Sequence, residues 1–146
     1  MELKVIKLTE KYLEESVDLF IDTFSREPWN DEYDSRDQVK DFFINHMRNN
    51  YFLGYIGLID ENVVALSLGM KKPWIAGMEY YIDEFCISYD LQGKGIGSSF
   101  LKDIEELLID EKVEGMILNT ERDYPSCDFY EKNGFKILGN LVVLGK

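Results

Sequence analysis

A glycine-rich segment, Gln92-Gly93-Lys94-Gly95-Ile96-Gly97, constrains the fold of this chain more than any other feature. It follows a long predicted strand, residues 78–88, and precedes another short predicted strand, residues 116–120. Between them, apolar residues recur at helical spacing: Phe100, Leu101, Ile104, Leu107 and Leu108. A strand, a glycine turn, a helix and a second strand in this order predict a right-handed crossover between parallel strands.

The rest of the chain predicts elements that surround this unit. Strands are expected at residues 2–8, 51–59 and 63–70, and a final hairpin at 135–138 and 141–144 around Gly139-Asn140. Helices are expected after Thr9, after the capping box Ser35-Arg36-Asp37-Gln38, and from Pro125 to Gly134. The order β α α β β β α β α β β indicates an α/β (α+β) domain. It has a mixed central sheet of six to seven strands flanked by about four helices.

Composition limits the class of protein. A length of 146 residues suits one domain, residues 1–146, and 45% apolar and 14% aromatic residues support a real core. The formal net charge of −12 argues against a nucleic-acid partner, and no apolar run approaches the ~20 residues that span a bilayer. Cys86 and Cys127 lie far apart and form no metal motif, so we expect free thiols, no metal and a cytoplasmic protein without a membrane partner.

The glycine turn predicts an anion site. Glycine lets the backbone approach a ligand closely, and a helix start offers unpaired N–H groups and the positive end of the helix dipole. Lys94 adds a cation at the rim. A dinucleotide fingerprint is excluded because Ser98 or Phe100 occupies the place of its third glycine. A P-loop is excluded because Gly95 follows Lys94. The alternative is a glycine turn with a purely structural role.

Two motifs together resemble those of the GNAT family of N-acetyltransferases. The pattern Gln/Arg-x-x-Gly-x-Gly/Ala at residues 92–97 is similar to the family's pyrophosphate-binding turn, and Phe129-Tyr130 with Gly134-Phe135 resembles its Phe-Tyr-x-x-x-Gly-Phe segment. Two departures exist. The family often has a proline before the turn, where this chain has Ser88-Tyr89-Asp90, and it often has an asparagine and an alanine at the positions of Asp123 and Ser126. The resemblance spans nearly the whole chain and implies a GNAT-like fold, N-acetyltransferase activity and acetyl-CoA as cofactor.

The resemblance also implies which residues contact acetyl-CoA. Tyr130 matches the family's usual proton donor to the departing thiolate. A backbone amide near Cys86 or Ile87 would bond the thioester carbonyl, and a β-bulge in that strand would aim it. The expected cofactor-binding residues are Phe85, Cys86, Ile87, Gln92, Gly93, Lys94, Gly95, Ile96, Gly97, Ser98, Asn119, Phe129, Tyr130 and Lys132.

The candidates for the catalytic base are Asp83 and Glu84, consecutive carboxylates in an otherwise apolar strand. Alternation sends them to opposite faces of the sheet unless a bulge intervenes. Glu84 fits the family's commoner spacing to the glycine turn, and Asp83 fits some aminoglycoside-modifying members; a water relay is a third possibility. His46 lies near the polar side of its helix, and we expect a surface histidine.

The segment 25–34 mixes acids with aromatic residues, as expected of an acceptor site for a cationic amine. Its Glu27 and Trp29, together with Tyr81, are the predicted substrate-binding residues. The segment looks like that of small-molecule members related to the aminoglycoside 6′ type.

The predicted function is acetyl transfer from acetyl-CoA to a primary amine of a small cationic molecule, by direct attack on the thioester. A protein or peptide N-acetyltransferase and a non-catalytic acyl-CoA-binding module are the alternatives. The short C-terminal strand could pair between subunits of a homodimer.

Overall fold

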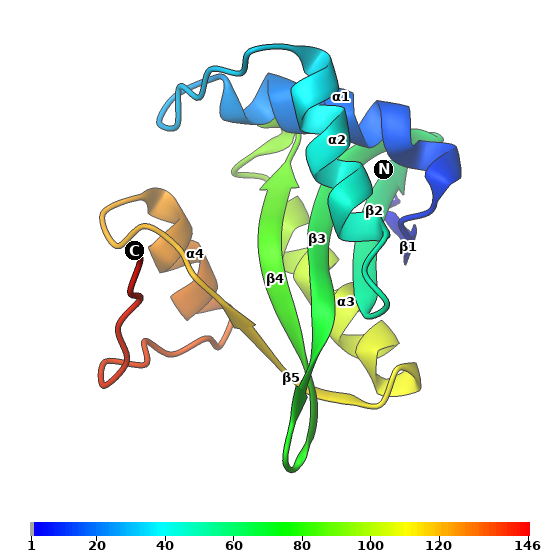
Figure 1. The fold of residues 1–146 in the computed structure, drawn as a ribbon. Coiled ribbons are helices and arrows are strands. Elements are labelled where there is room, and N and C mark those ends of the chain that lie inside the picture. Colours follow the sequence, from blue (N-terminus) through cyan, green and yellow to red (C-terminus); the bar gives the residue numbers. More distant parts are fainter. Residues whose placement is uncertain (1) are drawn as a thin grey trace.

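The computed structural model describes residues 2–146, and its elements follow the predicted order as far as the last helix (Figure 1). The five strands are β1 (Lys4–Lys7), β2 (Phe52–Ile59), β3 (Asn62–Trp74), β4 (Gly77–Ile87) and β5 (Val113–Leu118). The α-helices are α1 (Leu13–Phe24), α2 (Arg36–Met47), α3 (Ile96–Asp110) and α4 (Pro125–Lys132), and the 3-10 helices are η1 (Glu10–Tyr12) and η2 (Tyr89–Leu91).

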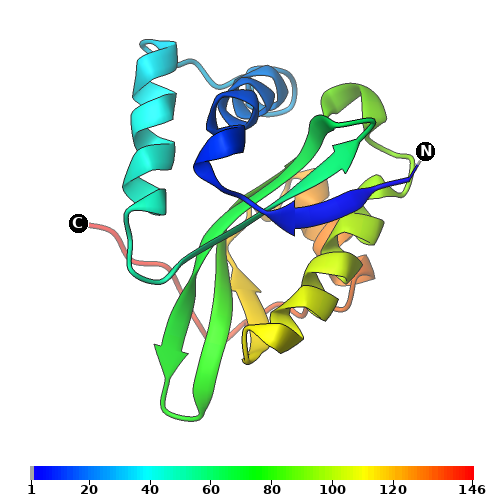
Figure 2. The same cartoon turned by 90° about the vertical axis from the view of Figure 1, so that its right-hand side faces the viewer.

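The strands form one mixed sheet in the order β1-β2-β3-β4-β5. The first three pairings are antiparallel, and β4 runs parallel to β5. Helix α3 makes the connection between these parallel strands, which confirms the predicted parallel crossover. Figure 2 shows α1 and α2 on one face of the sheet, with α3 and α4 on the other.

Each face of the sheet covers a separate apolar cluster. On the α1/α2 face, Val17 and Phe43 are fully buried against Leu66 and Leu68 of β3. On the opposite face, Phe100 and Ile104 of α3 pack with other buried residues, among them Tyr55, Ala65, Tyr80 and Ile82. Burying apolar side chains on both faces is the main stabilising contribution to such a layered fold.

Local signals explain where several elements begin and end. Ser35 Oγ accepts a hydrogen bond from the backbone N–H of Gln38 at 3.1 Å, which confirms the predicted cap of α2. Pro125 occupies the first turn of α4, and Gly134 ends that helix with a φ of 91°. Thr9 makes no side-chain capping bond, and η1 separates it from α1.

The predicted C-terminal hairpin is wrong, so the sheet has five strands rather than six or seven. A turn does form, because the N–H of Leu141 donates to the carbonyl of Leu138 at 3.1 Å. A two-residue hairpin turn needs positive φ, however, and neither Gly139 nor Asn140 has it. Two short strands alone are also marginally stable without a surface that buries their apolar side chains.

None of the helices within residues 2–146 combines the length and the apolar character that crossing a membrane requires. Cys86 and Cys127 are free thiols, as predicted, with Cys86 buried and Cys127 partly buried.

Candidate active site

A β-bulge in β4 sets the direction of its two acidic side chains. Leu68 of β3 lies opposite Glu84, the next residue, Gly69, lies opposite Ile82, and Asp83 is the extra residue between them. A Cβ on Gly69 would lie 2.0 Å from the carbonyl oxygen of Tyr81, so this close approach of the two strands requires glycine.

The bulge brings Asp83 and Glu84 to the same face of the sheet. Glu84 lies opposite Leu68, which belongs to the cluster under α1 and α2. Asp83 Oδ2 lies 3.5 Å from Nδ1 of His46, which belongs to α2. Strict alternation would have separated the two carboxylates, and the bulge removes that separation.

The two carboxylates differ in burial. Burial raises the pKa of Glu84 to about 7, and the negative charges of Asp83 and Asp31 add to the effect. Burial also raises the pKa of Asp83, while the charge of His46 opposes that rise. At neutral pH, Glu84 is therefore the carboxyl group that exchanges a proton most readily.

His46 is not the surface residue that its helical position suggested. Its side chain is only 17% exposed, and its ring packs edge-on against Phe42 with centroids 4.7 Å apart. Sequence periodicity placed the residue near a polar face, but in the folded chain this side chain lies against Asp83 of β4.

Strands β4 and β5 separate at the bulge. Their pairing ends at Ile82 and Leu118, so residues 83–87 have no partner on the β5 side. Figure 1 shows the two strands diverging there. Alternate backbone N–H groups along this stretch of β4, which includes Cys86 and Ile87, therefore have no strand to pair with on that side.

The predicted glycine turn opens onto the same end of β4. Gly93 and Gly95 have φ values of 75° and 82°, and nothing lies within 4 Å of a Cβ built on either. The side chain of Gln92 donates from Nε2 to the carbonyl of Ile87 at 3.1 Å. Gln92 thus holds the turn against the strand, while the glycines keep its outer surface free of side chains.

The start of α3 is suited to an anion. No side chain caps it, and its first turn contains no acidic residue. The first turns of α1, α2 and α4 all contain at least one. Among residues 2–146, no hydrogen bond to a protein acceptor engages the backbone N–H of Ile96, Gly97 or Ser98. These N–H groups, with the exposed Lys94 beside them, fit the pyrophosphate of coenzyme A.

An aromatic cluster connects this turn to α4. A Cβ on Gly97 would lie 3.0 Å from the ring of Phe129, so the glycine lets α3 and α4 approach closely. Phe129 and Tyr130 pack against each other with centroids 5.2 Å apart, and both contact Phe85 of β4. The motif residues from two distant parts of the sequence therefore meet beside the gap between β4 and β5.

Tyr130 is buried, with 8% of its surface exposed. Burial raises the pKa of its phenol, and the charges of Cys86 and Glu84 contribute to the same shift. Within the described residues, no side-chain hydrogen bond engages its hydroxyl group. The hydroxyl is also not among the polar side-chain atoms that are fully buried without a hydrogen-bond partner. A neutral phenol near Glu84 is available to donate a proton to a leaving group.

The remaining residues that the sequence predicted for the site lie on β4, just after β5, on the loop after α1 and on α4. Asn119 Nδ2 donates to the hydroxyl of Tyr81 at 2.6 Å across β4 and β5. Trp29 is partly buried against Phe24, with ring centroids 5.0 Å apart, and Glu27 is exposed on the same loop. Lys132, at the end of α4, is also exposed, and no ion pair joins it to the described residues of the site.

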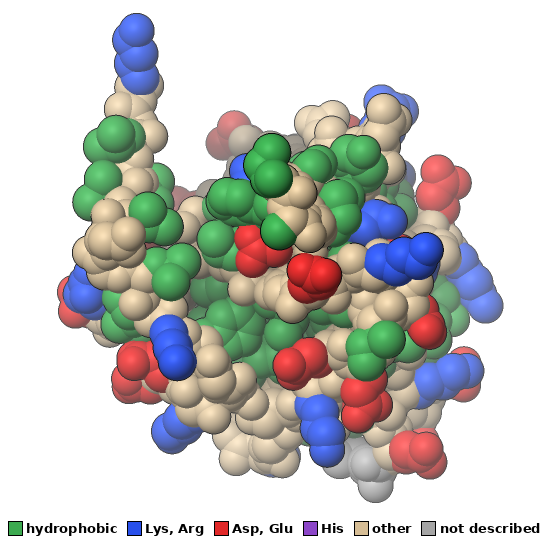
Figure 3. Space-filling model, turned by 90° about the horizontal axis from the view of Figure 1, so that it is seen from below, with side chains coloured by type: hydrophobic (Ala, Val, Ile, Leu, Met, Phe, Trp, Pro, Cys, Tyr) green, Lys and Arg blue, Asp and Glu red, His purple; other side chains and the backbone are tan. Residues whose placement is uncertain are grey.

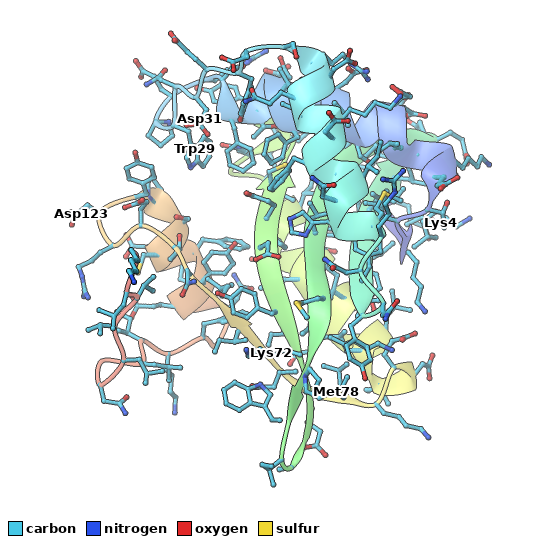
Figure 4. All side chains as sticks on the ribbon, viewed as in Figure 1. Lys4, Trp29, Asp31, Lys72, Met78 and Asp123 are labelled. Atoms are coloured by element: carbon cyan, nitrogen blue, oxygen red, sulfur yellow. The ribbon has the colours of Figure 1, made fainter. Side chains whose placement is uncertain are left out.

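Asp31 is a site residue that the sequence did not single out from its acidic neighbours. It accepts a hydrogen bond from the hydroxyl of Tyr33 at 3.4 Å, and its charge raises the pKa of Glu84. Figure 4 labels Trp29 and Asp31 on the loop between α1 and α2, and Asp123 on the facing loop before α4. Arg26, at the start of the first loop, stacks on Tyr89 at 4.8 Å and so connects that loop to the region of the glycine turn.

A splayed pair of parallel strands, an uncapped helix start and a buried tyrosine lie together at one end of β4, an arrangement suited to binding an acyl-CoA. The sequence profile of the Acetyltransferase (GNAT) family matches residues 8–135. The chain belongs to this family and is an N-acetyltransferase whose acetyl donor is acetyl-CoA.

Solved structures of low sequence identity share the fold. An aminoglycoside acetyltransferase from an uncultured soil metagenomic sample, in complex with sisomicin, is 16% identical, with a TM-score of 0.76 over 99% of this chain and 95% of the other. The aminoglycoside N-acetyltransferase AAC(6')-Iy, in complex with CoA, is 10% identical, with a TM-score of 0.76 and the same coverage. A ribosomal-protein-alanine N-acetyltransferase from Brucella melitensis is 13% identical, with a TM-score of 0.77 over the whole of both chains.

Proposed function

We propose that this chain forms a single catalytic domain and transfers acetyl to a primary amine of a small, cationic molecule by direct attack on the thioester. The observation that carries the proposal is the bulge at Asp83. It places two carboxylates on the α1/α2 face of β4, where that strand parts from β5. The aminoglycoside acetyltransferases among the structural neighbours are consistent with an amine of this kind.

The acidic surroundings favour a cationic acceptor. The negative charges of Asp83 and Asp31 add to the burial that raises the pKa of Glu84, and His46 is the basic residue beside Asp83. An ammonium group is attracted to such a site and stays charged until a base removes its proton. Trp29 and Tyr81 would supply the apolar and aromatic walls that orient the carbon skeleton.

Glu84 is the proposed base. A carboxyl group with a pKa of about 7 is half ionised at neutral pH and can accept the proton of the attacking amine, directly or through a water molecule. Asp83 is paired with His46 and is more exposed, so we assign it to electrostatic attraction of the acceptor. This assignment favours Glu84 between the two candidates.

The donor side would be held by the glycine turn and by β4. Acetyl-CoA, when bound, supplies the thioester and the thiolate that leaves. The N–H groups of Ile96, Gly97 and Ser98 would bind its pyrophosphate, and an unpaired amide near Cys86 or Ile87 would stabilise the carbonyl oxygen as it gains charge. The Tyr130 phenol would give its proton to the leaving sulfur.

A turnover screen tests the proposal. Thiol release from acetyl-CoA is measured with polyamines, aminoglycosides, amino acids and basic peptides, and we expect a small polycationic amine to be the best substrate. Acetyl-CoA at saturating concentration should also raise the melting temperature. Exclusive acetylation of peptides would reject the small-molecule assignment, and binding without turnover by any amine would reject catalysis.

A matched pair of variants tests the base. Glu84→Gln should lower kcat/KM by about 100-fold and abolish its rise with pH around neutrality, because general-base catalysis contributes gains of this size. Glu79→Gln, on the same strand at the opposite end, should leave the profile unchanged. Equal behaviour of the two variants would assign proton removal to water.

A further inference from the structure

The loop that joins α1 to α2, residues 25–34, depends on Arg26 for its backbone structure. The carbonyl of Arg26 accepts a hydrogen bond from the N–H of Trp29 at 3.1 Å. The N–H of Asp31 donates to the carbonyl of Phe24, the last residue of α1, at 2.8 Å. Trp29 and Asp31, which the proposed function places beside the acceptor, are therefore held to the end of α1 by these backbone bonds.

The side chain of Arg26 leaves the loop and contacts the segment that follows β4. Its guanidinium stacks on the ring of Tyr89 at 4.8 Å, and its Nη1 lies 3.8 Å from Oδ1 of Asp90. Nη2 of the same guanidinium lies 3.1 Å from Oδ1 of Asp22 in α1. Figure 1 and Figure 2 both show this segment beside the end of α1. A planar guanidinium that stacks and pairs in this way joins α1 to η2 in a defined geometry.

Tyr89 begins the segment that leads into the glycine turn. It is the first residue of η2, and its carbonyl accepts a hydrogen bond from the N–H of Gln92 at 3.3 Å. The N–H of Leu91 donates to the carbonyl of Ser88 at 2.9 Å. Gln92 is the first residue of the glycine turn, and its side chain holds that turn against β4. A displacement of the glycine turn is thus passed through η2 to the ring of Tyr89.

The contact of Arg26 with η2 has little weight as a stabilising interaction. The side chains of Arg26 and Asp90 are 42% and 85% exposed, and ion pairs this exposed contribute little to the stability of a fold. Its consequence is local, because it fixes the loop relative to η2. Arg36, just after the loop, offers a comparison. Its side chain is equally exposed and pairs with Glu14 and Asp18, so these ion pairs hold α2 to α1.

We propose that Arg26 is a positioning residue for acetyl transfer, which couples the glycine turn to the loop at the acceptor site. Coenzyme A bound at the glycine turn fixes η2, and the stack on Tyr89 then holds Trp29 and Asp31 in place for the amine. Arg26 acts through Tyr89 and the loop backbone rather than by contact with the reacting groups. Because such coupling is reciprocal, the amine raises the affinity for coenzyme A through the same contact. The role of the loop rests on the proposed function, whereas its response to coenzyme A does not.

The fluorescence of Trp29 tests the coupling without an acceptor. The chain has two tryptophans, and Trp74→Phe leaves Trp29 as the only one. Trp74 ends β3 on the β3–β4 hairpin, where Figure 4 labels Lys72 and Met78, at the opposite end of the molecule from Trp29. Figure 3 views the molecule from the hairpin end and shows hydrophobic side chains exposed there. The substitution therefore changes an exposed side chain without touching the loop.

Acrylamide quenching of Trp29 is measured without coenzyme A and at a concentration that saturates each variant, as calorimetry determines. Coenzyme A should reduce the quenching in the Trp74→Phe protein, because it orders the loop. The reduction should disappear when Arg26→Ala or Tyr89→Leu is added. It should persist with Tyr89→Phe, which keeps the ring, and with the matched control Arg36→Ala. No reduction in the Trp74→Phe protein, a reduction that survives Arg26→Ala, or an equal loss with Arg36→Ala would overturn the proposal.

Steady-state kinetics with the best amine of the turnover screen tests the positioning role. Arg26→Ala should raise KM for the amine by at least about fivefold with little change in kcat, as expected when coupling between two sites is lost. Tyr89→Leu should have the same effect, and the double variant should be no worse than either single variant, because both remove one contact. Fully additive effects, or an unchanged KM in Arg26→Ala, would overturn the positioning role. A screen without turnover of any amine would reject the proposed function, and the response of Trp29 to coenzyme A would then decide the coupling by itself.

Discussion

Nδ1 of His46 lies 3.5 Å from Oδ2 of Asp83, and this contact joins α2 to the bulge of β4. It exists because the bulge turns Asp83 toward the α1/α2 face, where Glu84 also points. Glu84 is the more buried of the two carboxyl groups, and the charge of the neighbouring Asp83 adds to the burial that raises its pKa.

The first prediction concerns Asp83→Asn. Removing this carboxylate takes away a negative charge that raises the pKa of Glu84, so that pKa should fall below about 7. The acidic limb of the kcat/KM profile, measured against pH with the best amine, should then move to lower pH. Asp41→Asn, on the exposed surface of α2, should not move it. A limb that stays in place in the Asp83 variant would mean that another group produces it.

The second prediction concerns stability. The pKa of Glu84 rises from 4.5 to about 7 on folding, so the folded protein binds the proton more tightly and loses stability as pH rises through this range. The loss amounts to roughly 3 kcal/mol above neutrality. Glu84→Gln removes it, so the stability of this variant relative to wild type should increase by about 2 kcal/mol between roughly pH 5.5 and pH 8.

Urea unfolding at several pH values measures this difference. Glu79→Gln serves as the control, because it makes the same substitution at the other end of β4 from the bulge, and it should show a constant offset. A constant offset for Glu84→Gln as well would show that Glu84 ionises normally in the folded protein.

Much of the fold could be predicted because its signals are local. Apolar periodicity located the faces of α1 and α3, and the capping box located the start of α2. The final hairpin could not be predicted in the same way. Apolar strand-like residues at 141–144 indicate what the segment prefers to pair with, but the strand that would cover them is not a local property.

The residues of the candidate site also fall into two groups, those that local motifs predict and those that depend on tertiary structure. Gly93, Gly95 and Tyr130 could be chosen from short motifs, and the structure brings them to one end of β4. The shared direction of Asp83 and Glu84 depends on the register with β3, where Gly69 alone permits the bulge. His46 and Asp31 reach the carboxylates through tertiary packing, which no spacing in the sequence reveals.

The third prediction concerns the glycine turn. Gly95 has a φ of 82°, so Gly95→Ala strains the backbone by about 1 kcal/mol and places a methyl group where the cofactor phosphate would approach. Calorimetry should show at least about tenfold weaker binding of CoA, which corresponds to one or more lost amide contacts. Gly139→Ala is the matched control, because that glycine lacks positive φ and also has open space around it. Equal affinities of the two variants would place the pyrophosphate elsewhere.

The last prediction concerns the phenol of Tyr130. Tyr130→Phe keeps the ring contacts with Phe85, Phe129 and Phe135, so the melting temperature and the affinity for CoA should change little. The variant loses only the hydroxyl, so kcat should fall by more than about threefold when chemistry limits the rate, since the thiolate then leaves without its proton donor. Tyr51→Phe, at a residue that is 45% exposed and distant in sequence from the motif, should keep full activity. The two variants are compared in single-turnover measurements with a fast amine. A Tyr130 variant as active as wild type in that assay would mean that the thiolate departs unprotonated or takes its proton from water, and the phenol would then serve only to pack α4 against β4.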